Sequence, residues 1–299
     1  MAAPLVISVI LNTNHRDDTL QCLASLEQSD YPNQRTLLLD NASTDGTVAA
    51  VKGRWPAVQV IELKENLGYA GNNNVGIEAA IAQGAEWVFV LNEDTWQAPD
   101  CISRLIAVGE SDVKIGILGP MVYHASEPTI IQSAGGRMDA YYREWHMGRN
   151  EPDQGQFHEP HPVEWISGCG ILVRRALIEQ VGAIDARFFY YAEELEWCLR
   201  AREAGWKVVH VPEAKLWHKG VTRDYQPKPS VTYYATRNRL LLLLKHHASL
   251  PAWMVTWAQL LRTLASWTLR PKWRSKVEHR KAMWRGMIDF VRGRWGPMP

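Results

Sequence analysis

The first regular element expected in the chain is the stretch Leu5-Val6-Ile7-Ser8-Val9-Ile10-Leu11-Asn12-Thr13-Asn14. Residues 5–11 form an apolar, β-branched run, which favours a β-strand. Residues 1–4 show neither a basic segment nor a cleavage site, so we interpret the run as a first strand and not as a signal peptide. The polar residues Asn12, Thr13 and Asn14 follow this run directly. Their side chains could bind a polar ligand at the end of the strand.

Outward from this stretch, strand-like and helix-like segments alternate. Apolar residues at helical spacing predict helices, and short apolar runs predict strands. The alternation indicates an α/β fold with βαβ units and a mostly parallel sheet. The expected strands are 36–39, 58–63 and 87–91, the expected helices are 17–28, 69–82 and 193–204, and strand candidates follow at 163–173, 207–211 and 215–217. Residues 119–162 lack a clear pattern and suggest loops with short strands.

Three of the expected strands end in the same kind of residues. Residues 12–14, 40–46 and 92–94 are rich in Asn, Asp, Ser and Thr. Ligands in open α/β sheets bind beyond the carboxyl ends of the strands. A single loop of this type is explained equally well by turns and helix caps. Three loops at one sheet edge favour a site for a hydroxyl-rich ligand and a hard cation.

Carboxylates and one histidine are the candidate reactive groups. Asp94 follows a buried strand, where it is suited to bind Mg²⁺ or Mn²⁺ together with substrate phosphates. Glu193, Glu194 and Glu196 lie at an expected helix start behind an aromatic run, which predicts a general base of raised pKa. Acids are also favoured at helix starts by the helix dipole alone. His218, at another strand end, is a candidate metal or phosphate contact, although a lone histidine is more often a packed one.

Composition restricts the class of protein. The 299 residues are 46% hydrophobic, enough for one large α/β domain or one domain with an appendage. The four cysteines are scattered, which indicates a reducing, cytoplasmic setting. The net charge of +1 is divided unevenly, because residues 236–299 hold 13 Lys and Arg but only 2 Asp and Glu.

This basic tail is also rich in tryptophan. Trp253, Trp257 and Trp267 fall at roughly helical spacing, and a cluster of Lys and Arg follows them. A membrane-spanning helix is marginal here, whereas an amphipathic helix lying in an anionic membrane surface fits better. The alternative is a helical hairpin that packs on the catalytic domain or on a second subunit, as in a homodimer. We therefore predict residues 1–235 to be a catalytic domain and 236–299 to be a basic helical extension.

The ordered motifs resemble those of family-2 glycosyltransferases with a GT-A fold, especially the rhamnosyltransferase-like branch. The resemblance covers residues 6–246. Its motifs are Ser8-Val9-Ile10-Leu11-Asn12-Thr13-Asn14, Leu39-Asp40-Asn41-Ala42-Ser43-Thr44-Asp45-Gly46-Thr47, Asn66-Leu67-Gly68-Tyr69-Ala70-Gly71, Leu91-Asn92-Glu93-Asp94-Thr95, Ser167-Gly168-Cys169-Gly170-Ile171-Leu172-Val173-Arg174-Arg175, Phe189-Tyr190-Tyr191-Ala192-Glu193-Glu194-Leu195-Glu196, His218-Lys219-Gly220 and Tyr234-Ala235-Thr236-Arg237-Asn238.

The resemblance implies a fold and roles for single residues. It implies a GT-A, Rossmann-like sheet flanked by helices, with a C-terminal helical extension. Asp94 corresponds to the last acid of the D-x-D metal motif and His218 to the second metal or diphosphate contact, with Mg²⁺ or Mn²⁺ as cofactor. Glu194 corresponds to the catalytic base. The residues implied to bind the nucleotide sugar are Thr13, Asp40, Asn66, Gly71, Asn92, Asp94 and Gly168.

Three positions depart from the family pattern, one of them Asn72, which replaces a glycine usual in the Gly-rich turn. Asn92 replaces the first acid of D-x-D, so that Asp94 is left as the main carboxylate for the metal. The base position is Glu instead of Asp, and Glu reaches about one methylene further. Glu193 or Glu196 therefore remain alternatives to Glu194 as the base.

The expected function is an inverting, metal-dependent transfer of rhamnose or another hexose from a nucleotide-diphosphate sugar. The expected acceptor is a glycan or a lipid-linked glycan in cell-surface polysaccharide synthesis, at the inner face of the cell membrane. A non-catalytic nucleotide-sugar or glycan-binding protein is the alternative. A Rossmann oxidoreductase is excluded because G-x-G-x-x-G is absent after the first strand, and the acidic body offers no groove for nucleic acid. The hypothesis requires Asp94, His218 and Glu194 to converge on one cleft.

Overall fold

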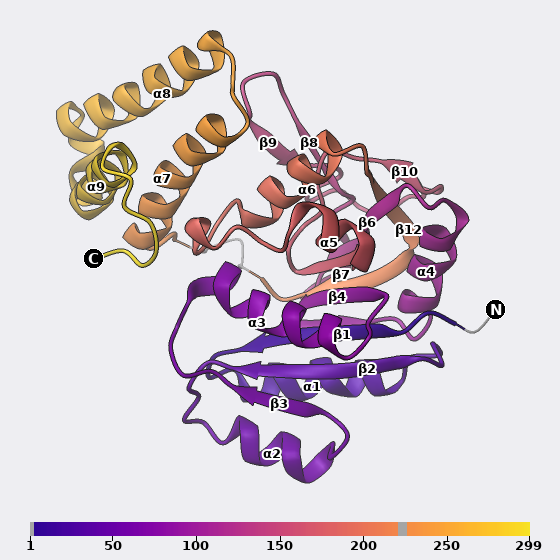
Figure 1. Cartoon of the computed structure of the whole chain (residues 1–299). Helices are drawn as coiled ribbons and strands as arrows, with labels where there is room; N and C mark the ends of the chain where they lie inside the picture. Colours follow the sequence, from indigo (N-terminus) through magenta and orange to yellow (C-terminus); the bar gives the residue numbers. More distant parts are fainter. Residues whose placement is uncertain (1–2, 221–225) are drawn as a thin grey trace.

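One twisted sheet with helices on both faces forms the body of the protein, and a group of C-terminal helices lies to one side of it (Figure 1). The computed structural model describes residues 3–220 and 226–299. Within these residues, ten strands form the main sheet and two more form a small separate one.

The strands and helices have the following bounds. The strands are β1 (Val6–Asn12), β2 (Gln34–Asp40), β3 (Gln59–Glu62), β4 (Trp87–Asn92), β5 (Thr95–Gln97), β6 (Ile115–His124), β7 (Glu127–Ser133), β8 (Gly136–Met138), β9 (Glu144–His146), β10 (His161–Pro162), β11 (Gly170–Arg174) and β12 (Lys207–His218). The helices of the body are α1 (Arg16–Glu27), α2 (Thr47–Arg54), α3 (Gly68–Ala82), α4 (Cys101–Ser111), α5 (Arg175–Val181), the 3₁₀ turn η1 (Ala186–Phe188) and α6 (Glu193–Glu203). The C-terminal helices are α7 (Pro229–Lys245), α8 (Leu250–Leu269), the 3₁₀ turn η2 (Pro271–Lys276) and α9 (Val277–Val291).

The sheet has the order β10-β12-β6-β11-β4-β1-β2-β3, with β5 beside β12 and β7 beside β6. Strands β3, β2, β1 and β4 are all parallel, whereas β11 runs antiparallel to both β4 and β6. The α/β fold class is thus confirmed, and the sheet is mixed, with β12 paired to β6 in parallel as well. Strand β11 lies antiparallel between β4 and β6, so that β6 and β12 run in the same direction as the N-terminal strands.

Strand β1 shows why this half forms. Its side chains alternate between two apolar layers, with Ile7 and Val9 on one face and Val6 and Ile10 on the other. Helix α3 covers the first face, and helices α1 and α4 cover the second. A strand buried on both faces needs a nearly continuous apolar run, which is the pattern seen in the sequence.

The main departure from expectation is β6, a ten-residue strand in the segment without a clear pattern. The strand contains two glycines and Pro120, which obscure its pattern in the sequence. The structure explains Gly119, because a Cβ added there would lie 2.2 Å from Ile166. Two further expectations were wrong in extent. The expected strand 163–173 begins only at Gly170 and runs to Arg174, and the two candidates at 207–211 and 215–217 form one strand, β12, with a register shift after Val211.

The C-terminal helices have a small core of their own. Leu240, Leu260, Leu264, Met283 and Met287 are buried there, and Trp253, Trp257 and Trp267 pack against them. The tryptophan stripe therefore faces the inside of the helical group. Helix α7 crosses the expected boundary at residue 235, and the division into two domains stays a prediction. Among the described residues, the structure contains no helix of the length and apolarity needed to cross a membrane.

Candidate active site

The polar ends of β1, β2 and β4 lie side by side, as the sequence predicted. Asn12 is paired with Asp40 in the register of β1 and β2, and Asn92 lies opposite Leu11. The amide of Asn12 donates to Asp40 at 2.9 Å and to the hydroxyl of Ser43, also at 2.9 Å. Both Asn12 and Asp40 are buried. Their buried hydrogen bonds therefore fix the positions of the loops that follow β1 and β2.

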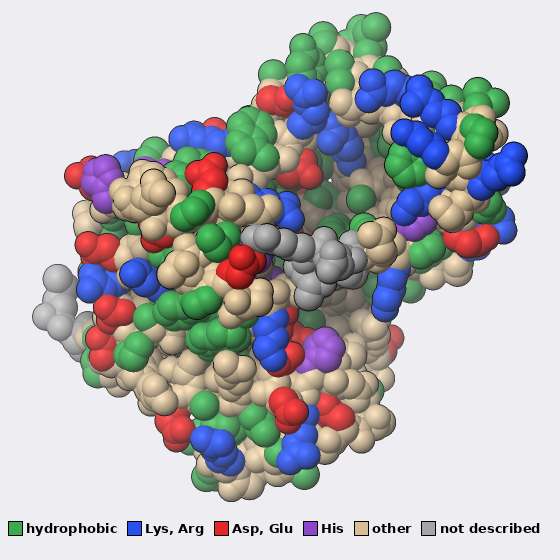
Figure 2. Space-filling model, turned by 180° about the vertical axis from the view of Figure 1, so that it is seen from behind, with side chains coloured by type: hydrophobic (Ala, Val, Ile, Leu, Met, Phe, Trp, Pro, Cys, Tyr) green, Lys and Arg blue, Asp and Glu red, His purple; other side chains and the backbone are tan. Residues whose placement is uncertain are grey.

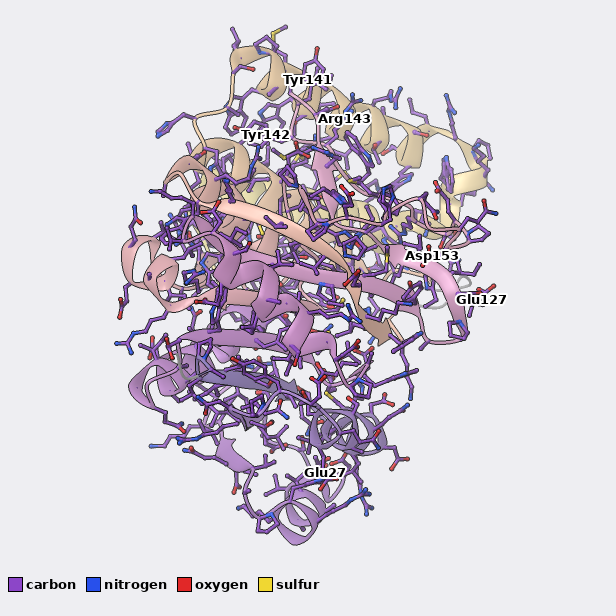
Figure 3. All side chains as sticks on the ribbon, turned by 90° about the vertical axis from the view of Figure 1, so that its right-hand side faces the viewer. Glu27, Glu127, Tyr141, Tyr142, Arg143 and Asp153 are labelled. Atoms are coloured by element: carbon purple, nitrogen blue, oxygen red, sulfur yellow. The ribbon has the colours of Figure 1, made fainter. Side chains whose placement is uncertain are left out.

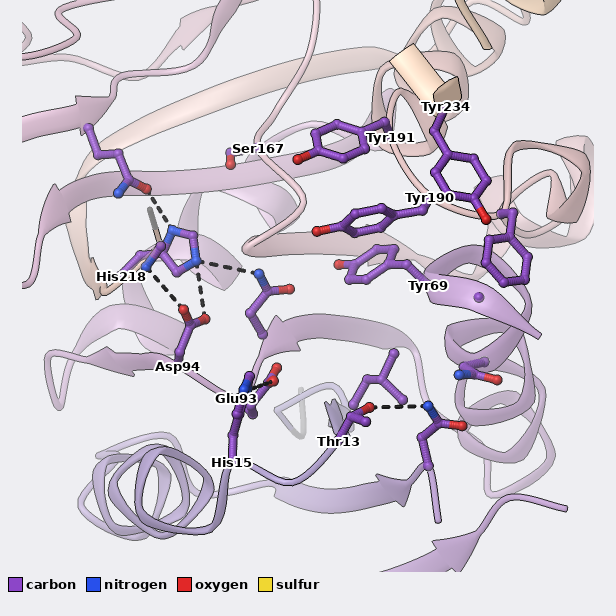
Figure 4. A pocket seen from close by; sticks show the side chains of 18 of the residues that line it. Thr13, His15, Tyr69, Glu93, Asp94, Ser167, Tyr190, Tyr191, His218 and Tyr234 are labelled. Carbon is purple, nitrogen blue, oxygen red and sulfur yellow. Dashed lines mark hydrogen bonds and ion pairs between the residues drawn. The ribbon is translucent and has the colours of Figure 1, made fainter. Parts of the chain in front are cut away.

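These loops border a cavity of about 670 Å³ at the carboxyl ends of the strands. Of the predicted binding residues, Thr13, Asn66, Asn92, Asp94 and His218 line the cavity, whereas Asp40, Gly71 and Gly168 do not. Asn41 takes the place expected for Asp40 at the wall and donates to the hydroxyl of Thr13 at 3.2 Å. An aromatic wall stands opposite the polar loops (Figure 4), formed by Tyr69, Phe189, Tyr190, Tyr191 and Tyr234.

Glycines at the start of α3 bring this wall close to the loop before the helix. Gly68 has a φ of +76°, and a Cβ placed on it would lie 2.5 Å from the carbonyl oxygen of Phe189. A side chain at this position would therefore push the aromatic segment away. Gly71, expected at the nucleotide, is buried within α3, and a Cβ there would meet the side chain of Leu67.

Asp94 and His218 meet in the cavity, although 124 positions of sequence separate them. One imidazole nitrogen of His218, Nε2, lies 3.1 Å from Oδ1 of Asp94, and the other lies 2.7 Å from the amide oxygen of Gln132. The backbone N–H of Gly220 donates to Oδ2 of Asp94 at 3.0 Å. These contacts fix both side chains and point them at the same place (Figure 4).

The contacts also set the charge of the pair. Burial opposes ionisation of Asp94, but the hydrogen bonds from His218 and from the Gly220 N–H outweigh it and lower the pKa of the carboxyl. Burial likewise opposes protonation of His218, but Cys169 and Asp94 outweigh it and raise the pKa of the imidazole to about 10. A carboxylate held in its charged form is suited to a cation.

The donor set fits a hard divalent cation with few protein ligands. Asp94 offers carboxylate oxygen, and His218 would offer an imidazole nitrogen close beside it once a bound cation displaced its proton. The part of the chain that the structure describes contains no group of three or more His, Cys, Asp or Glu side chains arranged around one metal position. Mg²⁺ and Mn²⁺ sites often use one or two protein ligands and take the rest from substrate phosphates and water.

The segment between η1 and α6 has an unusual backbone. Phe189, Tyr191 and Ala192 all have φ between 62° and 74°, a region that non-glycine residues rarely adopt. Asn238 of α7 supports it, since its amide nitrogen lies 2.7 to 2.8 Å from the carbonyl oxygens of Phe188, Tyr190 and Tyr191. The segment is strained locally and held from outside, a combination common at functional sites.

Arg237, beside Asn238, donates to the carbonyl oxygens of Arg187 and Phe188 at 3.2 and 3.0 Å. The sequence motif containing Arg237 and Asn238 was recognised. Nothing in the sequence indicated that both side chains donate hydrogen bonds to the backbone of the segment that precedes the glutamates of α6. Their role became visible only when α7 packed against that segment.

The three glutamates of α6 have different surroundings. Glu196 is fully buried and paired with Arg200 at 2.9 Å and with Lys245 at 2.8 Å, so its charge is already neutralised. Glu193 is 4% exposed, and its Oε2 has no hydrogen-bond partner. Burial and the neighbouring charge of Glu194 raise its pKa well above the usual value.

Glu194 is the member of this group that faces open space. It lines a second cavity of about 700 Å³, which shares His146, Arg149 and Tyr191 with the first. Burial raises the pKa of Glu194, although backbone N–H groups, including that of Gly168, oppose the shift. Tyr69 donates to the carbonyl oxygen of Gly168 at 2.7 Å and thereby ties the wall of the first cavity to the neighbour of Glu194.

The three groups required by the sequence hypothesis thus lie in two adjoining cavities. Asp94 and His218 line the first, and Glu194 lines the second. Arg149 and His146, at the junction, were not predicted. They come from the segment without a clear pattern, where the sequence carries no signal for them.

Comparisons with known proteins identify relatives along most of the chain. Residues 6–182 match the family model described as "Glycosyl transferase family 2". The N-acetylglucosaminyl-diphospho-decaprenol L-rhamnosyltransferase of Mycobacterium tuberculosis is 31% identical over 83% of this chain and 83% of its own. The dTDP-rhamnosyl transferase RfbF of Shigella flexneri is 24% identical over 79% of each chain.

Solved structures share the fold. The mannosyltransferase PcManGT from Pyrobaculum calidifontis, in complex with GDP-Man and Mn²⁺, superposes with a TM-score of 0.61 and 17% identity, covering 97% of this chain and 88% of its own. S. aureus TarS 1–349 superposes with a TM-score of 0.60 and 14% identity, covering 96% of this chain and 80% of that one. At these identities the likeness shows the fold alone, which agrees with the GT-A architecture expected from the motifs.

Proposed function

The chain belongs to glycosyl transferase family 2, and from this premise we propose that it transfers rhamnose or another hexose from a nucleotide-diphosphate donor, with inversion. The proposed acceptor is a glycan or a lipid-linked glycan of a cell-surface polysaccharide, in keeping with the activities named for the relatives. The observation that carries the proposal is the pairing of Asp94 with His218 beside the cavity of Glu194.

In this proposal the first cavity holds the donor. Thr13, Asn41 and Asn66 contact the base and ribose, and Asp94 with His218 orients the diphosphate. A divalent cation, when bound there, would neutralise charge that develops on the leaving diphosphate. The Mn²⁺ in the structure of the mannosyltransferase PcManGT supports a divalent ion of this type.

Glu194 is the proposed base. It takes the proton of an acceptor hydroxyl, whose oxygen bonds to the anomeric carbon on the face opposite the nucleotide. The bond between that carbon and the donor phosphate breaks, and its electron pair leaves with the diphosphate. One displacement inverts the configuration. A raised pKa makes Glu194 a better proton acceptor than an ordinary carboxylate.

Thermal stabilisation by nucleotide sugars, with and without Mn²⁺, tests the donor site, and a transfer assay with the best donor tests the chemistry. We expect one donor class to raise Tm by roughly 5 °C at a hundredfold excess over its Kd, with Mn²⁺ increasing the effect. NMR of the product should show an inverted anomeric centre. Binding without turnover of any donor would support the alternative, a nucleotide-sugar-binding protein, and no binding at all would refute both.

We further propose that the basic extension, residues 236–299, binds the surface of an anionic membrane. Its outer faces expose apolar side chains, with Met254 and Leu261 on α8 and Trp284, Ile288 and Val291 on α9. Lys and Arg side chains gather on the same helices (Figure 2), which complements anionic lipid. The apolar groups that would enter the lipid are thus different from the tryptophans of the internal core.

Sedimentation of the full chain with lipid vesicles tests this surface. Vesicles containing phosphatidylglycerol should retain the protein, and phosphatidylcholine alone should retain much less. Leu261→Asp should weaken retention, whereas Arg35→Ala, an exposed change on β2, should not. Equal retention by both vesicle types, or none by either, would contradict the proposal.

A further inference from the structure

The end of the chain, residues 292–299, returns from α9 to the first turns of α7, where Tyr234 lines the proposed donor cavity (Figure 1). Gly293, with a φ of +63°, ends α9. Its N–H and that of the next residue donate to carbonyl oxygens of the last turn of α9, at 3.0 and 2.8 Å. Glycine is common at this position because the left-handed backbone reverses the chain there. We call residues 292–299 the terminal segment.

One hydrogen bond joins the terminal segment to the aromatic wall of the cavity. The backbone N–H of Met298 donates to the hydroxyl of Tyr234 at 2.7 Å, and the Met298 side chain packs against the cluster that contains Tyr233 and Tyr234. Tyr234 is 6% exposed, and its ring stacks on Phe189 with centroids 5.5 Å apart. Figure 4 shows Tyr234 beside Tyr190, which it meets edge to face. The Met298 N–H therefore restrains one end of the wall.

A buried arginine makes a second connection between the terminal segment and the wall. Arg237 is fully buried, and its guanidinium donates to the carbonyl oxygen of Gly296 at 2.7 Å and to that of Phe188 at 3.0 Å. The guanidinium carbon lies 5.2 Å from the ring centre of Tyr234 and 6.0 Å from that of Trp295. Attraction between the cation and both aromatic faces adds to the hydrogen bonds.

The charge of Arg237 makes this connection sensitive to the terminal segment. Among the described residues, no carboxylate forms an ion pair with Arg237, whose acceptors are the oxygens of carbonyl, amide and hydroxyl groups. A buried cation without a carboxylate depends on each polar acceptor around it. Loss of the Gly296 carbonyl would leave an N–H of the cation unsatisfied, which destabilises the present position of Arg237 and of the rings packed on it.

Helix α9 keeps the terminal segment close to α7. A Cβ added to Gly286 would lie 2.8 Å from the carbonyl oxygen of Tyr233 and 3.4 Å from the backbone nitrogen of Arg237. Tyr233 also donates its hydroxyl proton to Asp289 of α9, at 2.9 Å. The two helices therefore meet at the turn of α7 that carries Tyr234 and Arg237, so that a displacement of α9 also displaces these two side chains.

The other end of α7 is held to the body independently of the terminal segment. In Figure 3, Tyr141, Tyr142 and Arg143 lie beside the C-terminal helices. The hydroxyl of Tyr142 donates to the carbonyl oxygen of His246, and Arg239 donates to that of Tyr141, both at 3.2 Å. A change in the terminal segment should therefore shift the wall without detaching α7 from the body.

We propose that the terminal segment is part of the donor site, because Met298 and Gly296 position the aromatic wall through Tyr234 and Arg237 and thereby set the affinity for a nucleoside diphosphate. This inference rests on the proposed function, in which the first cavity holds the donor. Met298 and Gly296 act as positioning residues, since neither lines the cavity itself. The C-terminal helices then complete the donor site in addition to their proposed contact with the membrane.

Calorimetric titration of the full chain with UDP and dTDP, in the presence of Mn²⁺, measures this dependence. Met298→Pro removes the N–H that donates to Tyr234, and should weaken binding of the preferred nucleotide about fivefold, the usual effect of one neutral hydrogen bond. Met298→Ala loses the side chain but keeps the N–H, so it should weaken binding less. Wild-type affinity of Met298→Pro would overturn the proposal.

A second variant tests the same wall from α9. Gly286→Ala should weaken nucleotide binding about tenfold, within the range expected when a methyl group is forced into a packed contact. Gly53→Ala is the matched control, since it adds a Cβ to a helix, α2, with no heavy atom within 4 Å. It should bind nucleotide like wild type. Met298→Pro keeps the test valid even if Gly286→Ala fails to fold.

Tyr234→Phe tests whether the effect of Met298 passes through the hydroxyl. Phenylalanine keeps the ring but cannot accept the Met298 N–H. In the Tyr234→Phe background, Met298→Pro and Met298→Ala should therefore bind nucleotide equally, because the hydrogen bond is already absent. A further fivefold loss from Met298→Pro in this background would contradict the proposed route.

The kinetic pattern separates positioning from a purely structural role. In the transfer assay, Met298→Pro should raise the donor KM and leave kcat within about twofold of wild type, because Asn238 holds the carbonyl groups ahead of Glu194. A lower Tm with unchanged nucleotide affinity and donor KM would mean that the terminal segment only stabilises the fold, and would refute the inference.

Hydrogen exchange needs no nucleotide and distinguishes this inference from the proposed function. Amides of residues 186–192 should exchange faster in Met298→Pro than in Met298→Ala, because the wall is less restrained. Faster exchange, combined with a wild type that binds neither nucleotide, would refute the proposed donor site while the hold of the terminal segment on the wall stands. Unchanged exchange, combined with normal nucleotide binding by every variant, would refute this inference alone.

Discussion

Asp94 and Glu194 are carboxylic acids on adjoining cavities, yet the protein shifts their pKa values in opposite directions. Asp94 follows a strand and accepts hydrogen bonds from His218 and from a backbone N–H, which lower its pKa. Glu194 begins a helix behind aromatic side chains, where burial raises its pKa. One group is therefore kept charged, and the other is prepared to accept a proton.

Two carboxyl groups whose surroundings shift their pKa values in opposite directions usually have different chemical roles. The difference follows from what surrounds each group, because both side chains have nearly the same intrinsic acidity. In the proposed mechanism, the donor half of the site holds charge and the acceptor half moves a proton. The following four changes test this division, beginning with the largest expected effect.

Glu194→Gln should reduce turnover by roughly 10²- to 10⁴-fold, the usual contribution of a general base. The substitution removes the carboxylate that takes the proton of the acceptor hydroxyl, while the donor cavity is unchanged. Transfer rate and nucleotide affinity are measured on the same protein, and the affinity should stay at the wild-type value. Turnover near the wild-type rate would remove Glu194 from its proposed role.

Asp94→Asn should lower kcat/KM on the order of a hundredfold by removing charge beside the leaving diphosphate. Nucleotide binding with Mn²⁺ should weaken, and binding in EDTA should change little. Glu179→Gln is the matched control, since Glu179 lies on α5, lines neither cavity and pairs with Arg175 at 2.6 Å. An equal loss in both variants would show that Asp94 has no special role.

Asn238→Ala should lower the transfer rate roughly tenfold, because small misplacements of a reacting group are costly. Asn238 holds three carbonyl oxygens of the segment that precedes Glu194. Kinetics and nucleotide affinity together test the prediction, with the affinity expected to remain near that of wild type. Loss of nucleotide binding to the same degree would mean that the two halves of the site depend on one another.

Glu193→Gln should change stability on the order of 1 kcal/mol, a typical effect for one unpaired buried polar group. The pKa of Glu193 is raised in the folded protein, so folding favours its protonated form. Wild type therefore loses stability as pH rises from the ordinary carboxyl pKa through the raised one, whereas the glutamine variant does not. Urea unfolding between pH 5 and pH 8 measures the difference, which should grow with pH in favour of the variant.

The sequence predicted the donor half of this site better than the acceptor half. Thr13, Asn66 and Asp94 follow apolar segments or begin a helix, and such short-range signals locate them at one sheet edge. Asp40 was expected to contact the nucleotide, but the structure buries it under Asn12. The sequence shows that a polar residue follows a strand, but not which way its side chain turns.

The acceptor half depends on contacts between distant segments. Arg149 and Arg239 line one cavity although 90 positions of sequence separate them, and each alone resembles an ordinary surface arginine in the sequence. The three glutamates of α6 also look alike in the sequence. Their packing separates them into a paired acid, a buried acid and a cavity-facing acid.

By itself, the sequence determined the family, the alternating strands and helices, and the set of polar strand ends, because these follow from local periodicity and from motif order. The tertiary structure decided which glutamate faces a cavity, which cations remain unpaired and how the tryptophans pack. Those properties depend on burial and on neighbours far away along the chain, and a pKa or an ion pair exists only once both partners are in place.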